Sequence, residues 1–312
     1  MSATILPFAR PLSTAVMALQ SHVPTSAMTA DMLGTDRQGH AVQVSPDGLL
    51  LSAGYLLIEA DEVWLSNHLG QTVQGIVLAQ DYDSGLALLK PQRSLGNNYL
   101  ETAAAATLKV GDDATILSSS DRKPFNVQVF AREEFAGRWE YLLDEAIYTL
   151  PLFEQWSGAA LLNAENRLCG IGSLALGLSS PAGKVIAGNM FVPVDLVMPH
   201  LEYMSLHGSK PGALRPWLGV LVEAEEPGLT VLGLYAGSPA AKAGIRPGDR
   251  ILAVGDKIVS SLPGFFRSLW HYGPAGSRIP MLVSQNDRTR EVQLHTTDRN
   301  TFFMQHEAAT LN

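Results

Sequence analysis

Short apolar runs separated by turn residues recur between residues 41 and 192, and no other feature constrains the fold as strongly. Turn sequences such as SPDG at 45–48 and NHLG at 67–70 stand between the runs. Runs of this kind are typical of strands, and many of them at close spacing indicate an all-β barrel or sandwich. We expect strands at 41–44, 49–52, 63–66, 73–78, 86–89, 114–118, 126–130, 139–143, 159–162, 168–171 and 185–192.

Two short helices are expected beside these strands. Apolar residues recur at helical spacing within residues 11–22, so the N-terminal segment 1–30 is expected to carry one of them. Residues 193–204 predict a second, amphipathic helix. That helix would close a first domain at 31–206.

The following residues predict a second, smaller domain. Glycine and proline indicate a linker at 207–214, and we expect the second domain at 215–299 with a tail at 300–312. The expected strands of this domain lie at 217–220, 229–234, 251–254, 278–283 and 291–295, and its helices at 238–244 and 262–271.

Composition excludes several classes of protein. The chain has 312 residues and a net charge of −8 without any dense basic run, which argues against nucleic acid or an anionic membrane as partner. Its one cysteine, Cys169, excludes an internal disulfide, and the histidines show no paired ligand spacing, so neither a metal nor a cofactor is expected. No apolar stretch approaches the ~20 residues of a membrane span, and no export signal is recognised, so we expect a cytoplasmic location.

One segment points to chemistry. Residues 154–163, followed by 168–172, resemble the nucleophile segment of trypsin-like serine proteases, in which GNSGGPL(V)N precedes a GIN strand. Ser157 is the serine that falls at the nucleophile position of this motif. Because a neutral hydroxyl is a poor nucleophile, such a site needs a base and a carboxylate that orients this base.

The second domain resembles the PDZ domains attached to HtrA-family proteases. The similarity rests on WLGV at 217–220, GSPAAKAGIRPGDRILAV at 237–254 and SLPGFFRSLW at 261–270. It implies that the backbone N–H groups of Leu218, Gly219 and Val220 bind a peptide carboxylate while the peptide adds as a strand. Side chains that would wall a pocket for an apolar terminal side chain are Phe265, Phe266 and Leu269.

The first domain resembles the trypsin-like domain of the same family, and the motifs fix the register. SPDGLLLS at 45–52 matches the family's SPDGLILT, so the histidine of the following NAHVV falls on Tyr55. DYDSGLALLK at 81–90 matches DPxTDLALLK, so the aspartate falls on Gly85. A tyrosine with an ordinary pKa of about 10 is a poor proton acceptor, and glycine has no carboxylate to orient a base.

The resemblance therefore implies a mainly β protein: a trypsin-like double β-barrel without a complete triad, followed by a PDZ domain, a small β-barrel with two helices. We expect a pseudoprotease that binds peptide or protein carboxyl termini as a regulatory, scaffold or chaperone-like protein. Family resemblance alone also suggests a homo-oligomer, a trimer, and offers the periplasm or cell envelope as the alternative location.

A second alignment leads to an active enzyme. It takes residues 65–69 as the family's TNxHV motif, so that His68 is the base and acts with Ser157 and an acid such as Asp83 in a serine endopeptidase. The matches on both sides of Tyr55 favour the first alignment, which puts His68 in a surface turn.

Overall fold

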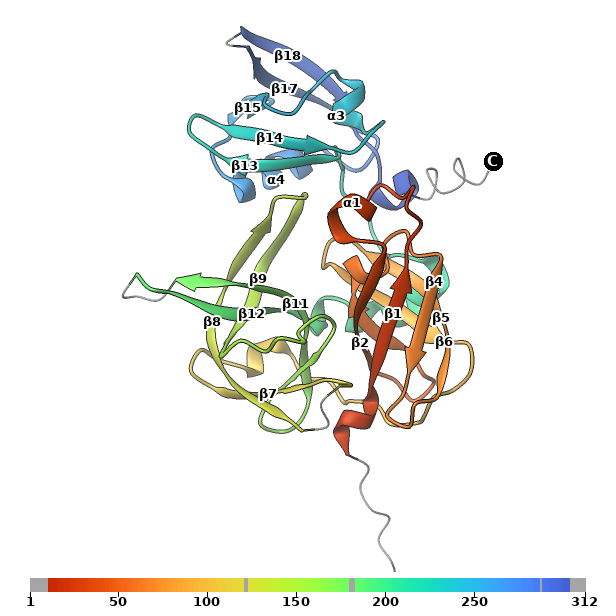
Figure 1. The fold of residues 1–312 in the computed structure, drawn as a ribbon. Coiled ribbons are helices and arrows are strands. Elements are labelled where there is room, and N and C mark those ends of the chain that lie inside the picture. Colours follow the sequence, from red (N-terminus) through yellow and green to blue (C-terminus); the bar gives the residue numbers. More distant parts are fainter. Residues whose placement is uncertain (1–10, 121–122, 180–182, 287, 304–312) are drawn as a thin grey trace, which may run out of the picture.

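A computed structural model of the protein describes residues 11–120, 123–179, 183–286 and 288–303. It contains two closed β-barrels and a further open sheet. The two barrels lie side by side, and the domain built on the open sheet lies across their upper end (Figure 1). The prediction of a mainly β chain with a double barrel followed by a smaller β domain is confirmed.

The first barrel has the strand order β1-β2-β3-β6-β5-β4. Its strands are β1 (Val16–His22), β2 (Asp36–Gln43), β3 (Leu50–Ala53), β4 (Glu62–Ser66), β5 (Thr72–Asp81) and β6 (Leu86–Pro91). The short helices on its connections are α1 (Ala30–Leu33) and η2 (Gly54–Leu56). Because side chains alternate across each strand, one set points inward, and Met17, Leu65 and Leu89 are among the buried core residues.

The helix expected within residues 11–22 was wrong. Only one 3₁₀ turn, η1 (Leu12–Ala15), precedes β1. β1 closes the barrel because it pairs with β2 along one edge and with β4 along the other. Val16 and Met17 are adjacent in the strand and both are buried. Because both neighbours are apolar, the apolar residues of this segment do not alternate as in a half-exposed strand, and their spacing resembles that of a helix. β1 therefore belongs to the first barrel, while residues 1–10 of the expected N-terminal segment lie outside the described chain.

The second barrel has the order β10-β11-β12-β9-β8-β7. Its strands are β7 (Asp113–Leu117), β8 (Phe125–Gly137), β9 (Tyr141–Leu150), β10 (Ala160–Leu162), β11 (Leu168–Ser179) and β12 (Val185–Pro193). β8 and β9 are longer than expected, and the start of the strand predicted at 139–143 lies in the turn that joins them. This β8–β9 hairpin, residues 125–150, rises from the barrel toward the upper domain (Figure 1).

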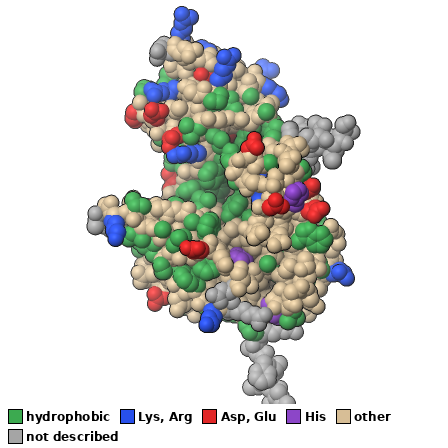
Figure 2. Space-filling model, in the orientation of Figure 1, with side chains coloured by type: hydrophobic (Ala, Val, Ile, Leu, Met, Phe, Trp, Pro, Cys, Tyr) green, Lys and Arg blue, Asp and Glu red, His purple; other side chains and the backbone are tan. Residues whose placement is uncertain are grey.

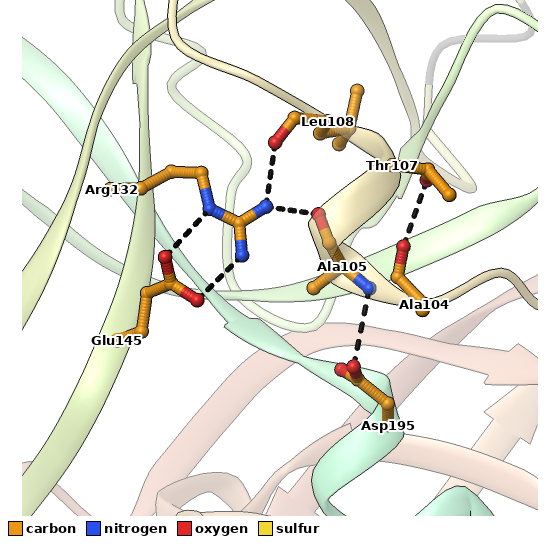
Figure 3. Close-up of polar contacts among 7 residues, drawn as sticks. All are labelled: Ala104, Ala105, Thr107, Leu108, Arg132, Glu145 and Asp195. Atoms are coloured by element: carbon orange, nitrogen blue, oxygen red, sulfur yellow. Dashed lines mark hydrogen bonds and ion pairs between the residues drawn. The ribbon is translucent and has the colours of Figure 1, made fainter.

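A mostly buried arginine side chain anchors the hairpin to a neighbouring loop (Figure 3). Arg132 on β8 donates from Nε and Nη2 to the two carboxylate oxygens of Glu145 on β9, at 3.0 and 2.7 Å. Its Nη1 donates to the carbonyl oxygens of Ala105 and Leu108, at 2.6 Å in the case of Leu108. Ala105 begins the 3₁₀ turn η3 (Ala105–Thr107), and its N–H donates to Asp195 at 3.3 Å. The hairpin is therefore tied to η3 below its tip.

The helix expected at 193–204 is divided. The structure has two 3₁₀ turns, η4 (Val194–Leu196) and η5 (Met198–His200), and then α2 (Leu201–His207). Pro199 has no N–H to continue a helical ladder from the preceding turn, which explains the interruption. Within the residues that the structure describes, no helix has the length and apolar character needed to cross a membrane.

The upper domain has a sheet in the order β13-β14-β15-β17-β18, with β16 beside β15. Its elements are β13 (Val220–Ala224), β14 (Leu229–Leu234), α3 (Pro239–Lys242), β15 (Arg250–Val254), β16 (Lys257–Ile258), α4 (Leu262–His271), β17 (Arg278–Gln285) and β18 (Arg288–His295). Ser238 and Ser261 cap the two helices, since each side chain accepts a backbone N–H of the first turn at 3.3 Å.

Candidate functional site

The loop that carries Ser157 keeps a tightly defined backbone. The N–H of Gly158 donates to the carbonyl oxygen of Gly172 on β11 at 2.8 Å, and the carbonyl oxygen of Ser157 accepts the N–H of His40 on β2 at 2.8 Å. Gly158 has a φ of +75°, and a Cβ there would lie 2.0 Å from the carbonyl oxygen of His40. Only glycine fits this position, so Ser157 is held between the two barrels.

Tyr55 is the side chain that meets the Ser157 hydroxyl. It lies on η2, after β3, and its Oη donates a hydrogen bond to Ser157 Oγ at 2.6 Å. The buried guanidinium of Arg37 fixes the backbone of this turn, because Nη1 donates to the carbonyl oxygen of Tyr55 at 2.8 Å. Burial raises the pKa of Tyr55, although the hydrogen bond with Ser157 acts in the opposite direction. The phenol is therefore a neutral donor toward Ser157.

Gly85, at the position of the family's aspartate, lies in the turn between β5 and β6. Its carbonyl oxygen accepts the N–H of Gly54 at 2.8 Å, which ties it to the turn that carries Tyr55. The ring of Tyr141 from β9 lies against Gly85, and Tyr141 Oη donates to the carbonyl oxygen of Ser84 at 2.6 Å. An aromatic ring thus occupies the space beside Gly85.

The residues of the second alignment do not come together. His68 lies in the exposed turn between β4 and β5. Asp83 forms an ion pair with Arg215, whose Nε lies 3.3 Å from Asp83 Oδ2. Neither side chain lines the groove of about 640 Å³ that contains Ser157 and Tyr55.

A different histidine supports the nucleophile loop. His40 is buried, and its Nδ1 accepts the backbone N–H of Ser119 at 3.4 Å and lies 2.8 Å from the Ser119 hydroxyl. Nε2 therefore carries the proton and donates to the carbonyl oxygen of Gln155 at 3.1 Å. Burial lowers the pKa of His40 to about 4, so the ring is neutral near pH 7. Both ring nitrogens are engaged away from the Ser157 hydroxyl, and His40 positions the loop.

Tyr55 lines two hollows. One is the groove described above, which Ser157 also lines. The other has a volume of about 450 Å³, and its wall is rich in aromatic side chains, namely Tyr55, Tyr82, Trp139, Tyr141, Trp156 and Tyr235. Figure 2 shows hydrophobic side chains gathered in the recess beneath the upper domain. Trp156 borders both hollows and leaves them open.

The loop at residues 218–220 does direct its N–H groups at a carboxylate. The three backbone N–H groups of Leu218, Gly219 and Val220 donate to the side chain of Glu140 at 2.9, 2.7 and 2.9 Å. Gly219 has a φ of +78°, and a Cβ there would lie 2.3 Å from Ser238 Cβ, so only glycine permits this turn.

The three helix residues expected to wall a peptide pocket are closed off. Phe265, Phe266 and Leu269 on α4 are fully buried. They belong to one apolar cluster with the loop residues Leu218 and Val220, and this cluster also contains Leu142 from the β8–β9 hairpin.

Four residues that shape these sites were not singled out from the sequence. Arg37, His40, Glu140 and Tyr141 act through contacts with residues distant in the chain. Arg37 and His40 lie in β2, whose sequence DRQGHAVQ is mostly polar, so neither is marked as a buried residue by its neighbours. Glu140 lies in a stretch expected to be a strand, and nothing in the sequence indicated a turn there.

Comparisons with known proteins agree with this architecture. Residues 39–171 match the model of the trypsin-like peptidase domain, and residues 216–296 match the model of the PDZ domain. The fold and the site thus define a trypsin-like peptidase domain followed by a PDZ domain.

Curated relatives match most of the chain. The serine endoprotease DegS of Haemophilus influenzae is 25% identical over 243 residues, which cover 73% of this chain and 67% of DegS. A probable periplasmic serine endoprotease, DegP-like, of Halomonas elongata is 23% identical over 285 residues, covering 83% of this chain and 56% of the relative. The chain spans little more than half the length of that DegP-like relative.

Solved structures support the same fold. The HtrA-type protease AlgW with a decapeptide superposes with a TM-score of 0.56 at 21% identity, covering 93% of this chain and 97% of AlgW. A serine endoprotease from Yersinia pestis gives a TM-score of 0.53 at 22% identity, covering 92% of this chain and 95% of that one. The protein is HtrA-like in fold and in the order of its domains.

Proposed function

We propose that this HtrA-like protein is non-catalytic and binds the carboxyl termini of peptides or proteins through its PDZ domain. The observation that carries the proposal is the hydrogen bond of 2.6 Å from Tyr55 Oη to Ser157 Oγ. A phenol stands where the family resemblance expects the imidazole base.

The chemistry of this pair disfavours acyl transfer. Attack on a peptide carbonyl requires that the Ser157 proton pass to a base as the bond forms. Even with a pKa of about 10, fewer than roughly one phenol in a thousand is ionised at pH 7, and burial raises the pKa of Tyr55. The imidazole of His40, which contacts the loop backbone at Gln155, is engaged by Ser119 and Gln155.

Binding rather than cleavage agrees with the PDZ loop. Three consecutive N–H groups that converge on one carboxylate form the kind of backbone nest that captures a chain terminus. A solved HtrA-type relative, AlgW, is described with a bound decapeptide. DegP-like relatives are described as periplasmic, which favours the periplasm or cell envelope over the cytoplasmic expectation.

A serine endopeptidase is the second candidate, because the curated relatives are named as endoproteases. One assay distinguishes the two candidate functions. The wild type and Ser157→Ala are treated with a fluorophosphonate probe and incubated with casein. We expect equal, background signals from both. Labelling and proteolysis that disappear in Ser157→Ala would establish the endopeptidase.

The binding half of the proposal has its own test. Peptides with free carboxyl termini are titrated against the same peptides with amidated termini. We expect the free carboxylates to bind more tightly, since only they match the N–H groups at residues 218–220. Equal affinities would contradict carboxylate recognition by this loop.

A further inference from the structure

The tip of the β8–β9 hairpin holds a carboxylate in a demanding position. Residues 138–140 join Gly137 to Tyr141, which face each other across the hairpin. Glu140 has a φ of +57°, a region that glycine adopts without penalty, and the residue is only 7% exposed. A strained backbone and a buried charge are retained where other contacts compensate for them.

Those contacts come from the PDZ loop. Oε2 of Glu140 accepts the N–H of Leu218, and Oε1 accepts the N–H groups of both Gly219 and Val220. Both carboxylate oxygens are therefore bonded as the two oxygens of a peptide terminus would be. The side chain of Glu140 stands in the position of a ligand carboxylate.

The hairpin also uses the strand edge that a ligand would use. β13 is an edge strand of its sheet, and the N–H of Val222 donates to the carbonyl oxygen of Arg138 at 2.9 Å. The guanidinium of Arg138 pairs with the carboxylate of Glu223 next along β13. A peptide that binds by strand addition requires the same edge.

Side chains of the hairpin cover the remaining walls of the groove. Leu142 is 5% exposed and belongs to the apolar cluster of Phe265 and Leu269. Outside that cluster, Arg267 of α4 forms ion pairs with Glu134 and with Asp144, 2.7 Å away in the latter case. The hairpin therefore contacts both β13 and α4, the two sides of the groove.

We propose that the β8–β9 hairpin is a built-in occupant of the PDZ groove, and that an external carboxyl terminus binds only after the hairpin tip withdraws. This proposal rests on the proposed carboxylate-binding function of the loop. Because the two occupants need the same N–H groups, the apparent affinity for a peptide is the intrinsic affinity multiplied by the fraction of molecules whose groove is open.

The contacts of the hairpin tip in the groove also indicate which chemical groups an external ligand needs. A matching polypeptide has a free terminal carboxylate for the 218–220 loop and an extended backbone that pairs with β13. It also has an apolar side chain that replaces Leu142 in the cluster on α4. Competition with a tethered segment favours partners that are abundant or that present several termini at once.

Hydrogen exchange on the full chain tests the occupancy directly. Glu140→Gly removes the carboxylate and suits the left-handed turn, while Glu133→Gln removes an exposed carboxylate of the same hairpin as the control. We expect the protection of the amides of Leu218, Gly219 and Val220 to fall at least about tenfold in Glu140→Gly, with strands β10 to β12 unchanged. The Glu133→Gln control should match the wild type.

Equal protection of the three amides in wild type and Glu140→Gly would overturn the proposal. Glu140→Asn provides a second variant in case the glycine variant does not fold, because asparagine tolerates a positive φ. Its side chain is one carbon shorter, so its amide oxygen cannot replace both carboxylate oxygens, and we expect a loss of protection here as well. Wild-type protection in Glu140→Asn would count equally against the proposal.

Peptide binding then separates this proposal from the proposed function. Fluorescein-labelled hexapeptides with apolar last residues, as free acids and as amides, are titrated into both proteins. We expect free acids to bind Glu140→Gly at least about tenfold more tightly than wild type. Equal affinity in the two proteins would contradict hairpin occupancy. Loss of amide protection without binding of any free acid would instead contradict the proposed function and leave the hairpin as the occupant.

Discussion

The ring of Tyr141 lies where a side chain on Gly85 would begin. A Cβ on Gly85 would lie 3.0 Å from Tyr141 Oη and 3.0 Å from Cε2. Gly85 belongs to the first barrel and Tyr141 to the second, so the contact crosses the interface between them. The space that the resemblance assigns to the orienting carboxylate is therefore filled by the opposite barrel.

This contact predicts that restoring the triad by sequence will not restore proteolysis. The double variant Tyr55→His with Gly85→Asp supplies an imidazole and a carboxylate. We expect casein cleavage to stay at the level of Ser157→Ala, because Tyr141 displaces the new carboxylate from the imidazole. Cleavage clearly above that level would show that the barrels reposition easily.

Gly85→Asp alone should destabilise the fold by about 1–3 kcal/mol, since a φ of +74° and the crowding by Tyr141 both oppose it. Urea unfolding measures the change. Gly70→Asp is the matched control, because Gly70 has a φ of +76° and open space around its Cβ position. A cost equal to that of Gly70→Asp would mean that Tyr141 moves aside without penalty.

A buried neutral histidine predicts acid sensitivity. Burial lowers the pKa of His40 from 6.5 to about 4. Between these values the unfolded chain binds a proton that the native state excludes, so stability falls as the pH decreases from about 6.5 to 4, by up to about 3 kcal/mol. Unfolding in urea at pH 7, 5.5 and 4 measures this loss. His40→Gln should reduce the pH dependence in this window, and an unchanged slope would remove His40 as its source.

Local motifs explain what could be predicted from the sequence. The turn at 45–48 and the strands around it are defined by neighbouring residues, so the register that brings Tyr55 to Ser157 could be inferred by matching motifs. Contacts between residues that are distant in the chain could not be inferred in this way. β1 resembled a helix because its pairing with β4 lies outside any local window, and Glu140 lies 78 residues from Leu218 in the chain. Both features depend on tertiary packing, which spacing alone does not encode.

The groove should also respond to pH. Burial, the larger effect, raises the pKa of Glu140 from 4.5 to about 7, although the backbone hydrogen bonds and the charge of Arg299 act in the opposite direction. Glu140 also lies near Tyr235, whose phenol it influences electrostatically. The docked hairpin therefore holds a proton between pH 4.5 and 7 that the withdrawn hairpin releases, so withdrawal becomes more favourable as the pH rises through this range.

Amide protection factors at residues 218–220, corrected for the intrinsic exchange rate, measure this effect without any peptide. We expect them to decrease by roughly a hundredfold from pH 4.5 to 7 and then to level off. Glu140→Gly should lack the dependence. Protection that increases with pH would show that the hydrogen-bonded carboxylate is favoured over its protonated form in the docked state.

The contacts of Arg132 below the hairpin tip should contribute to the stability of the fold. Arg132 is mostly buried, and Arg132→Met leaves the carbonyl oxygens of Ala105 and Leu108 without this donor. Unsatisfied buried acceptors cost about 1–3 kcal/mol, so we expect a loss of this size in urea unfolding. Arg167→Met is the control, because its pair with Glu101 is 3.7 Å long and more than half exposed on both sides, and such a pair contributes at most about 1 kcal/mol. If both variants lost the same stability, the hairpin would be held by its strand pairing with the barrel and not by Arg132.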